Sequence, residues 1–197
     1  MLAQSRLIVA TRNSHKTLEI RALLGDRWEV MDANDFVGLP VIEETGQTFL
    51  ENAVLKAEGI SRLLPGRVLA DDSGLEVDAL GGAPGVWSSS FGGEEGNHAK
   101  NNARLLSAML GQAVRTARFR CTMVLATAGI VQADFCGSVE GRLAEAGRGE
   151  GGFGYDPLFI PDGYEQTFAE LGQNLKNQLS HRARALSHAI AWLKDRP

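Results

Sequence analysis

Two adjacent carboxylates at the end of an apolar run are the residues of this 197-residue chain best suited to chemistry. The run Val68-Leu69-Ala70 leads directly into Asp71-Asp72-Ser73-Gly74. In open α/β sheets, ligands bind in the crevice beyond the carboxyl ends of the strands. Two neighbouring acids destabilise a fold through repulsion and desolvation unless a cation compensates. A plain turn would also use Asp, Ser and Gly, so at this point both interpretations stay open.

A basic segment follows another apolar run, Leu7–Ala10, which suits a buried strand. After it come polar residues and then a helix pattern with an apolar side: Leu18, Ala22 and Leu23. A strand, a polar turn and a helix start offer backbone N–H groups to an anion, and Asn13 or Ser14 could cap the helix. Lys16 lies in the first turn, where the helix dipole disfavours a cation. A phosphate bound by Lys16 would explain a cation at this position; a capped helix with a solvated lysine is the alternative.

The clearest predicted helix begins after Thr48, which has capping-box spacing with Glu51. Its apolar stripe is formed by Phe49, Leu50, Ala53, Val54, Ala57, Ile60 and Leu64. Thr48, Asn52 and Lys56 share one polar face at i, i+4 spacing. Such a face is usually solvated, and it would meet a ligand only if the binding site lay beside it.

The remaining segments alternate between strand and helix patterns. Strands are predicted at 28–31 and 75–80, a hairpin over 117–135 with Phe119, Cys121, Met123 and Leu125 on one face, and a third strand at 137–143. Helices are predicted over 97–110, with Ala99, Ala103, Leu106 and Leu110 inward, and after Ser180, with Ala183, Leu186, Ile190 and Leu193 inward. A meander after α/β segments predicts a mixed sheet rather than a parallel one.

A glycine-rich segment, 147–157, contains Phe153 and Tyr155. It lacks the strand-to-helix context of a dinucleotide-binding fingerprint and has no Walker pattern, so its glycines alone are weak evidence of function. Two aromatic side chains among glycines could form a wall on which a base stacks. Further along, His181 and Arg182 follow the predicted cap Ser180, a position that suits an anion or a polar base edge, although a histidine there is more often polar surface.

Bulk properties exclude several classes of protein. The formal net charge of −4 argues against broad binding to nucleic acid or anionic membranes. No apolar stretch approaches the roughly 20 residues that span a bilayer, and residues 1–6 lack a signal-peptide layout, so a cytoplasmic protein is expected. Cys121 and Cys136 lie in strand-like sequence without metal-type spacing, and both are expected to be reduced core residues, with a disulfide as the alternative.

Taken together, these segments resemble the non-canonical purine nucleoside triphosphate pyrophosphatases, the inosine/xanthosine triphosphatase family. The resemblance covers nearly the whole chain. It rests on six motifs in order: Ala10-Thr11-Arg12-Asn13-Ser14-His15-Lys16, Glu43-Glu44-Thr45-Gly46-Gln47-Thr48-Phe49, Ala70-Asp71-Asp72-Ser73-Gly74-Leu75, Gly81-Gly82-Ala83-Pro84-Gly85, Gly152-Phe153-Gly154-Tyr155-Asp156-Pro157 and Ser180-His181-Arg182. Each is weak alone, but the ordered set is specific.

The resemblance implies a single two-lobed α/β domain over residues 1–197, with a long mixed β-sheet flanked by helices and a central substrate cleft. It implies a homodimer that binds neither nucleic acid polymers nor membranes. The implied reaction is Mg²⁺-dependent hydrolysis of ITP, dITP or XTP to the nucleoside monophosphate and pyrophosphate, which would cleanse the nucleotide pool.

The same resemblance assigns roles to individual residues. Asp72 would be the catalytic base and a metal ligand. Glu43 would be the second metal carboxylate, with Glu44 a weaker candidate. The implied substrate-binding residues are Thr11, Arg12, Asn13, Ser14, His15, Lys16, Lys56, Ser73, Phe153, Gly154, Tyr155, Asp156, Lys176, His181 and Arg182. Of these, residues 11–16 would hold the triphosphate and residues 153–156 would line the base pocket.

The first loop departs from the family pattern. The family often has Gly at the positions of Arg12 and His15. The sequence therefore leaves open the conformation of this loop and its effect on substrate preference. A related hypothesis is a pyrophosphatase for modified pyrimidine nucleotides, and one from another class is a nucleotide-binding sensor without turnover.

The acid pair itself is expected to be asymmetric. If the strand continues through Asp71 and Asp72, their side chains point to opposite faces of the sheet. Because the resemblance assigns the substrate side to Asp72, Asp71 is expected to be a structural partner of nearby backbone or of a basic group.

Overall fold

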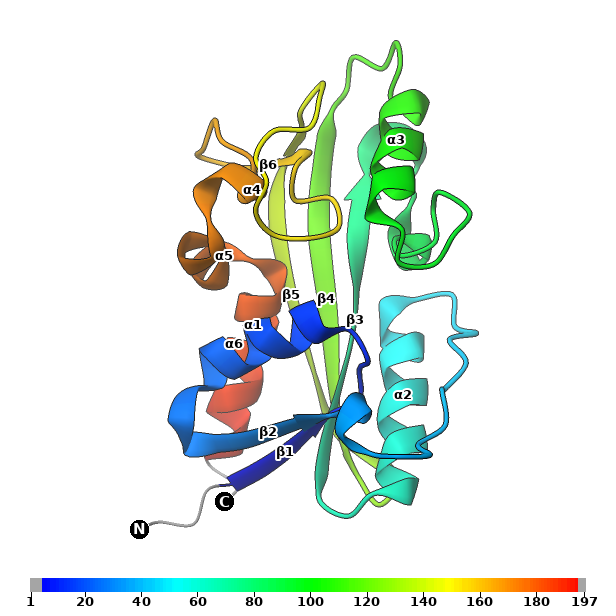
Figure 1. Ribbon diagram of the computed structural model, residues 1–197, viewed down its shortest axis with the longest axis vertical. Helices are drawn as coiled ribbons and strands as arrows, with labels where there is room; N and C mark the ends of the chain where they lie inside the picture. Colours follow the sequence, from blue (N-terminus) through cyan, green and yellow to red (C-terminus); the bar gives the residue numbers. More distant parts are fainter. Residues whose placement is uncertain (1–4, 195–197) are drawn as a thin grey trace. The chain divides into compact units, whose positions relative to one another are not determined.

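The computed structural model describes residues 5–194 and shows strands and helices alternating along most of the chain (Figure 1). In chain order the strands and α-helices are β1 Ser5–Val9, α1 Ser14–Leu24, β2 Trp28–Asp32, α2 Phe49–Leu63, β3 Arg67–Val77, α3 His98–Ala108, β4 Thr116–Thr127, β5 Ile130–Leu143, β6 Phe159–Pro161, α4 Phe168–Leu171, α5 Gln173–Leu179 and α6 His181–Lys194.

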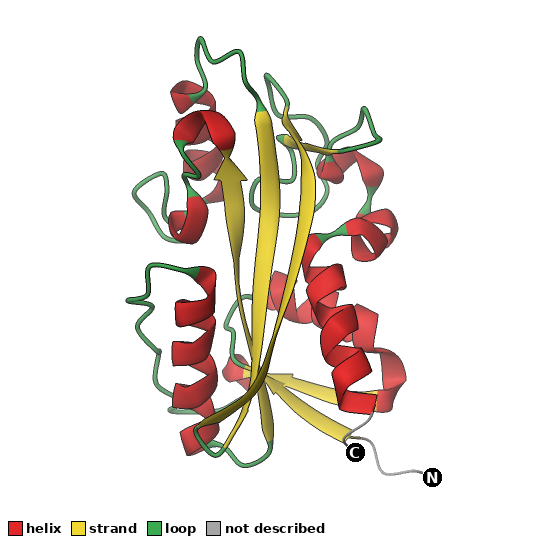
Figure 2. Ribbon diagram, turned by 180° about the vertical axis from the view of Figure 1, so that it is seen from behind, coloured by secondary structure: helices red, strands yellow, loops and turns green. Residues whose placement is uncertain are grey.

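The strands form a six-stranded sheet in the order β2-β1-β3-β4-β5-β6, which is seen from behind in Figure 2. Strand β1 is parallel to both β2 and β3, whereas β5 and β6 are antiparallel. The predicted α/β fold with a mixed sheet is therefore confirmed. The short, parallel β1 and β2 come from the strand–helix–strand start of the chain, and the long β4 and β5 from the predicted hairpin.

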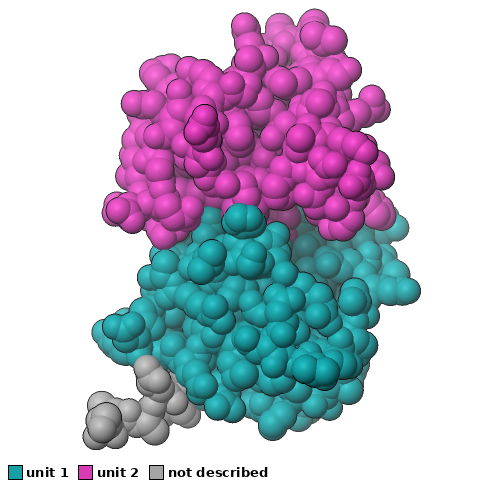
Figure 3. All heavy atoms as spheres, in the orientation of Figure 1, with its two compact units in different colours: residues 1–72, 121–137, 182–197 teal, residues 73–120, 138–181 magenta. Residues whose placement is uncertain are grey.

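The chain divides into two compact units, coloured separately in Figure 3. Unit 1 comprises residues 1–72, 121–137 and 182–197, and unit 2 comprises residues 73–120 and 138–181. Strands β3, β4 and β5 each contribute residues to both units. The boundary in β3 falls between Asp72 and Ser73, so the acid pair belongs wholly to unit 1.

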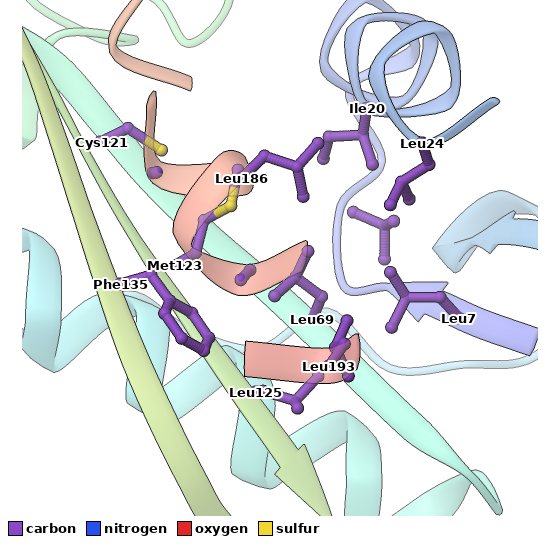
Figure 4. Close-up of a cluster of buried hydrophobic side chains, with 13 residues drawn as sticks. Leu7, Ile20, Leu24, Leu69, Cys121, Met123, Leu125, Phe135, Leu186 and Leu193 are labelled. Atoms are coloured by element: carbon purple, nitrogen blue, oxygen red, sulfur yellow. The ribbon is translucent and has the colours of Figure 1, made fainter. Parts of the chain in front are cut away.

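Unit 1 has a buried cluster on each face of its part of the sheet. On one face, strand side chains pack against α1 and α6; the cluster contains Leu7, Val9, Ile20, Leu24, Leu69, Cys121, Met123, Leu125, Phe135, Ala185, Leu186, Ala189 and Leu193 (Figure 4). On the other face, the alternate side chains pack against α2; this cluster includes Ile8, Ala10, Ala53, Ala57, Ile60, Val68, Ala70, Val124 and Ala126. The period-2 alternation of the strands therefore separates an α1/α6 face from an α2 face.

The alternation decides where the two acids point. Strand β3 continues through Asp71 and Asp72, as predicted. Leu69 lies on the α1/α6 face and Ala70 on the α2 face. Asp71 therefore follows Leu69 to the α1/α6 face, and Asp72 follows Ala70 to the α2 face.

Unit 2 is built around aromatic side chains. Its buried cluster combines strand residues with residues of α3, the loop before β6 and α4: Leu75, Val77, Leu105, Met109, Ala117, Phe119, Val139, Leu143, Tyr155, Leu158, Phe159 and Phe168. The Phe119 ring lies 4.8 Å from Phe159 and 6.2 Å from Phe168, between ring centroids. Aromatic pairs at these separations are favourable beyond the apolar area that they bury.

Two helices bury a different face from the one that their apolar residues predict. In α1 the predicted apolar side is largely wrong: Leu23 packs against the core, but Leu18 is exposed, and the buried residues are Thr17, Glu19, Ile20 and Leu24. In and just after α3 the predicted inner side is confirmed only for Leu106, which packs against the core; Leu110 is exposed, and Asn101, Leu105 and Met109 are buried. Tertiary contacts outweigh the apolar pattern here because both helices bury polar side chains that are hydrogen-bonded or paired with a charge.

Three further predictions can be compared with the structure. The hairpin is confirmed: Ala128 (φ 53°) and Gly129 (φ 78°) both have positive φ between β4 and β5, as a type I′ turn requires. The separate third strand is wrong, because residues 137–143 continue β5 without a break. Both cysteines are free; Cys121 is buried as predicted, but Cys136 is exposed, so its placement in the core was wrong.

None of the helices within residues 5–194 has the length and apolarity needed to cross a membrane.

Candidate functional site

The loop between β1 and α1 is held together by its own side chains. The Thr11 hydroxyl accepts a hydrogen bond from the backbone N–H of Asn13 at 3.1 Å. The Asn13 side chain accepts from the backbone N–H groups of His15 (3.0 Å) and Lys16 (3.3 Å), so Asn13 is the helix cap. Because those two N–H groups are already bonded, the Lys16 ammonium is the main group with which this helix start can bind an anion.

The other predicted residues of this loop have different surroundings. Arg12 donates from Nη2 to the backbone carbonyl of Leu39, and its own carbonyl accepts from the Asn34 side chain at 3.2 Å. Ser14 and His15 are exposed at the start of α1. Arg12 therefore ties this loop to the segment that follows β2, a contact that a glycine at the same position could not make.

Asp72 faces α2, as the alternation of β3 requires. Its Oδ1 lies 3.2 Å from the Lys56 ammonium, and its Oδ2 accepts a hydrogen bond from the Asn52 amide at 3.3 Å. Lys56 also pairs with Glu44, whose Oε2 lies 2.8 Å from the same ammonium. The polar face of α2 thus meets a carboxylate through Asn52 and Lys56, and the expectation of a fully solvated face is excluded for these two residues.

Burial and neighbouring charges set the protonation of the Asp72 carboxyl group. Burial raises the pKa of Asp72 to about 6, despite the opposing fields of Lys56 and Lys16, and the Glu44 carboxylate contributes in the same direction as burial. For Lys56, burial alone lowers the pKa, but the carboxylates of Asp72 and Glu44 outweigh it and the net shift is upward. The pair thus combines a carboxyl group that titrates near neutrality with a lysine that stays charged, which suits acid–base chemistry.

Two carboxylates near one cation also bear on metal binding. Within residues 5–194, no group of three or more His, Cys, Asp or Glu side chains could hold a metal ion. Mg²⁺ commonly uses only one or two protein carboxylates and completes its shell with waters and substrate phosphates. Asp72 and Glu44 meet that need, since both lie at the Lys56 ammonium. Glu43, the residue predicted for this role, is exposed like Glu44, and the contact with Lys56 is made by Glu44.

Asp71 faces α1 and α6 and lies in a chain of buried charges. Its Oδ2 lies 3.2 Å from the Lys16 ammonium, 3.3 Å from Arg182 Nε and 3.1 Å from Arg182 Nη2. Arg182 in turn pairs through Nη1 with the Glu19 carboxylate. The expected basic partner of Asp71 is therefore present twice, as Lys16 and as Arg182.

The charged forms of Asp71 and Arg182 are favoured in this chain of buried charges. Burial alone raises the pKa of Asp71, but Lys16 and Arg182 overcome it and hold the pKa well below its ordinary value. Burial alone lowers the pKa of Arg182, and the two carboxylates more than compensate. Arg182, which was predicted to bind the substrate, is fully buried and contacts both Asp71 and Glu19.

In unit 2, the predicted base-binding segment forms a tight turn around Asp156. Asp156 Oδ2 accepts a hydrogen bond from the backbone N–H of Phe153 at 2.8 Å. Gly152 has φ +74°, and a Cβ there would collide with the Asp156 carboxylate, so this position requires glycine. The sequence Gly152-Phe153-Gly154-Tyr155-Asp156 is therefore explained locally by a carboxylate that folds back onto the turn.

The same carboxylate holds Lys176, a predicted substrate-binding residue. The Lys176 ammonium lies 2.5 Å from Asp156 Oδ2, and both side chains are buried. It also lies 4.4 Å from the centroid of the Phe153 ring, within cation–π range. The His98 ring lies near Phe153 as well, at 6.1 Å between centroids. Phe153, Asp156 and Lys176 thus form one interacting group.

Tyr155 and His181 are less accessible than predicted. Tyr155 belongs to the buried cluster of unit 2, and its hydroxyl donates to the Ser88 carbonyl at 2.9 Å. The proposed aromatic wall therefore reduces to Phe153, which is half-buried. His181 is buried rather than polar surface, and its ring stacks on Phe119 at 4.8 Å with an interplanar angle of 10°. Ser73 is half-buried in β3.

Two residues near these groups were missed by the prediction. Glu19 pairs with Arg182, and the Asn102 side chain donates to the Gly154 carbonyl at 3.0 Å. The spacing of Glu19 three residues after Lys16, on the same side of a helix, was a usable signal. Asn102 carries no such signal, because its partner lies 52 residues away in sequence.

Comparison with known proteins identifies the family. The profile of the Ham1 family matches residues 7–192. The dITP/XTP pyrophosphatase of Geobacillus kaustophilus is 50% identical over 184 residues, covering 92% of this chain and 90% of the relative. That of Bacillus licheniformis is 47% identical over 190 residues, covering 95% and 97%. The solved Ham1 protein of Staphylococcus aureus superposes with a TM-score of 0.87 at 35% identity, covering 98% of this chain and 100% of that one. The resemblance inferred from the six motifs is confirmed, and the chain belongs to the Ham1 family.

Proposed function

We propose that this protein is a pyrophosphatase that hydrolyses non-canonical purine nucleoside triphosphates, ITP, dITP and XTP, to the monophosphate and pyrophosphate. The observation that carries the proposal is the Asp72–Lys56 pair of unit 1, a carboxyl group with its pKa raised to about 6 beside a charged lysine. The names of the relatives, dITP/XTP pyrophosphatase, agree with it.

The phosphate chemistry is assigned to unit 1. Lys16 and Lys56 would bind the triphosphate, whose roughly four negative charges need cations to offset them. The Asp72 carboxylate would accept a proton from a water molecule as the water oxygen bonds to the α-phosphorus. The anhydride bond between the α- and β-phosphates then breaks, and pyrophosphate leaves with the bonding electrons. Positioning and electrostatics would supply most of the rate enhancement, as in other phosphoryl transfers.

Mg²⁺ is proposed as the cofactor, held by Asp72 and by one glutamate. We favour Glu44 because it lies at the same ammonium as Asp72. When bound, the ion would offset negative charge on the phosphates and lower the pKa of a bound water. Comparing Glu43→Gln with Glu44→Gln for Mg²⁺ affinity would separate the two candidates.

Recognition of the base is assigned to unit 2. Phe153 would stack on the purine, and Lys176 and Asp156 would hold the Phe153 ring in place. The backbone N–H groups of this region are hydrogen-bond donors. Donors aimed at a 6-oxo oxygen would face the amino group of adenine donor to donor, and such mispairing discriminates strongly. Asn102 would keep the Gly154 carbonyl engaged and so reduce the acceptors open to an amino purine.

A substrate panel tests the proposal. The protein is incubated with ITP, dITP, XTP, GTP, ATP and dUTP, with Mg²⁺ or with EDTA, and released pyrophosphate is measured. We expect turnover of ITP, dITP and XTP well above that of ATP and GTP, dependent on Mg²⁺. Release of pyrophosphate from none of them would overturn the proposal, tight ITP binding without turnover would indicate a sensor, and preference for dUTP would indicate a pyrimidine enzyme.

The two units are proposed to act as a single catalytic domain, and the protein to work as a homodimer in the cytoplasm. Sedimentation equilibrium of the purified chain tests the dimer, and cell fractionation tests the compartment. A monomer across the micromolar range, or recovery with membranes, would contradict these proposals.

A further inference from the structure

The chain of charges on the α1/α6 face becomes more exposed toward one end. The side chains of Asp71 and Arg182 are 0% and 1% exposed, that of Glu19 is 5% exposed, and that of Lys16 is 15% exposed. A ligand that approaches these four charged residues can therefore reach Lys16 but not the guanidinium of Arg182. The ion pairs that connect Glu19 and Arg182 to Lys16 run through Asp71.

The contacts that Arg182 and Lys16 make with Asp71 fall on one oxygen. Arg182 Nε, Arg182 Nη2 and the Lys16 ammonium lie between 3.1 and 3.3 Å from Oδ2. Two cations that share one oxygen compete for it, because each draws it along a different direction. The position of the Lys16 ammonium therefore depends on how strongly Arg182 is drawn to Asp71.

Glu19 draws Arg182 in a second direction. The Glu19 carboxylate contacts Arg182 Nη1, while Arg182 Nε and Nη2 contact Asp71, so the guanidinium is shared between two carboxylates. Glu19 is buried on α1, the helix that also carries Lys16. Burial of a carboxylate is costly unless it is paired, so the Glu19–Arg182 pair balances charge in unit 1. Charge balance alone, however, predicts an effect on stability and none on phosphate affinity.

We propose that Glu19 is a positioning residue for phosphate binding: by holding Arg182, it fixes the Asp71 oxygen and thereby the ammonium of Lys16. This inference rests on the proposed function for the identity of the ligand, a polyphosphate. When Glu19 is neutral, its attraction no longer opposes that of Asp71 on Arg182, and Arg182 draws Oδ2 away from Lys16. Polyphosphate affinity then falls, whereas the proton transfer at Asp72, which faces α2, changes little.

The test uses Glu19→Gln, which removes the charge and keeps the shape and a hydrogen-bond acceptor. Inorganic pyrophosphate is titrated into the protein by calorimetry at fixed Mg²⁺, and the KM and kcat for ITP are measured in parallel. We expect the pyrophosphate Kd and the KM to rise about tenfold, within the range of couplings between residues of one network, with kcat within about twofold. Unchanged Kd and KM would overturn the proposal.

Ile20→Val is the matched control, because it removes one methyl group from the neighbouring buried position of α1 without touching a charge. It should lower the melting temperature and leave Kd and KM unchanged. If it raised Kd as much as Glu19→Gln does, the effect would follow from a loosened helix and the proposal would fail. Should Glu19→Gln not fold, Glu19→Asp, with the charge kept and its reach shortened, is measured in the same way; wild-type affinity in that variant would equally overturn the proposal.

A double-mutant cycle locates the effect at Lys16. In a Lys16→Met background, Glu19→Gln should change the pyrophosphate Kd by less than about twofold, because the group that it positions is gone. An undiminished effect in that background would contradict transmission through Lys16. Pyrophosphate binding is measured without turnover, so a wild-type protein that binds pyrophosphate but hydrolyses none of the nucleotides would overturn the proposed function alone. A wild-type protein that binds no pyrophosphate would overturn this inference.

Discussion

The two units use buried lysine–aspartate pairs in different ways. In unit 1, Lys56 pairs with Asp72 and with Glu44, and the Glu44 side chain is 44% exposed, so the charge network continues to the surface. In unit 2, Lys176 and Asp156 are both 2% exposed; Lys176 bonds to Asp156 and lies over the Phe153 ring, and Asp156 also bonds to a backbone N–H. The network of unit 1 can exchange one of its ion-pair partners for a ligand, whereas the pair in unit 2 holds the Phe153 ring and the turn around Asp156 in place.

This difference indicates that burial of an ion pair does not by itself identify a reactive site. A reactive pair needs one group that solvent or ligand can reach and one whose protonation can change near neutral pH. The network of unit 1 has both: the Glu44 carboxylate is exposed, and the pKa of Asp72 is raised to about 6. Asp156, which is enclosed by Lys176 and the Phe153 turn, serves as a structural acceptor in unit 2.

The largest expected effect separates Asp72 from its neighbour. Asp72→Asn should lower the kcat for ITP by about 10²–10⁴-fold, the usual contribution of a general base, and leave the protein folded. Asp71→Asn should instead cost about 3–5 kcal/mol of stability, because Arg182 stays buried with one carboxylate fewer. Steady-state kinetics and urea unfolding measure the two effects. Equal losses of kcat at unchanged stability in both variants would contradict the division between the two faces of β3.

The Asp156–Lys176 pair offers the corresponding test in unit 2. Asp156→Asn should destabilise the protein by about 3–5 kcal/mol, because it leaves a buried ammonium without its carboxylate. The double variant Asp156→Asn/Lys176→Met should recover part of that loss, since no buried charge remains unpaired. Thermal and urea unfolding are the measurements. If Asp156→Asn were as stable as the wild type but had lost turnover, the pair would belong with the reactive network and the contrast between the units would fail.

The sequence was sufficient for the parts of the site that depend on local pattern. The capping spacing of Thr48 and Glu51 predicted the start of α2, and the apolar run before Asp71 predicted a strand that separates the two acids. Alternation along a strand is a property of the backbone, so the opposite directions of the two side chains could be predicted without knowing any partner.

The partners themselves could not be predicted in this way. Glu19 was missed because carboxylates are rarely buried, and its partner Arg182 lies 163 residues away in sequence. The buried face of α1 was misjudged for the same reason, since Thr17 and Glu19 replace Leu18 on it. Tyr155 was expected at a base-stacking wall because aromatic residues among glycines suit that role, yet its ring belongs to the core of unit 2.

Replacing Phe153 tests whether unit 2 handles the base and unit 1 the phosphates. Phe153→Leu should weaken ITP binding by about 1–3 kcal/mol, the range for losing one aromatic stacking partner of a base, and so raise the KM by about 5–150-fold. Binding of inorganic pyrophosphate, which has no base, should be unchanged. Calorimetry with ITP and with pyrophosphate gives both values. A matching loss of pyrophosphate affinity would show that the two units do not divide the substrate in this way.

The smallest expected effect concerns protonation in unit 1. In the metal-free protein, the Asp72 carboxyl should titrate at about pH 6, followed by carboxyl-carbon NMR in EDTA. Its folded pKa exceeds its ordinary value, so the stability it contributes is present at low pH and is lost as the pH rises through about 6. Asp71 behaves in the opposite way: its pKa is lowered, so its contribution is present above the ordinary carboxyl pKa and is lost on acidification.

Replacing Glu44 sharpens this titration. Glu44→Gln removes a negative charge that raises the pKa of Asp72, so the midpoint should move to lower pH. The shift should be no more than about one pH unit, or about 1.4 kcal/mol, because Glu44 is partly exposed and water screens its field. Glu43→Gln is the control, because it removes the neighbouring exposed carboxylate and leaves the Glu44–Lys56 and Asp72–Lys56 ion pairs intact, and it should leave the midpoint in place. Equal shifts in both variants would mean that net charge, rather than the Glu44–Lys56–Asp72 network, sets the protonation of Asp72.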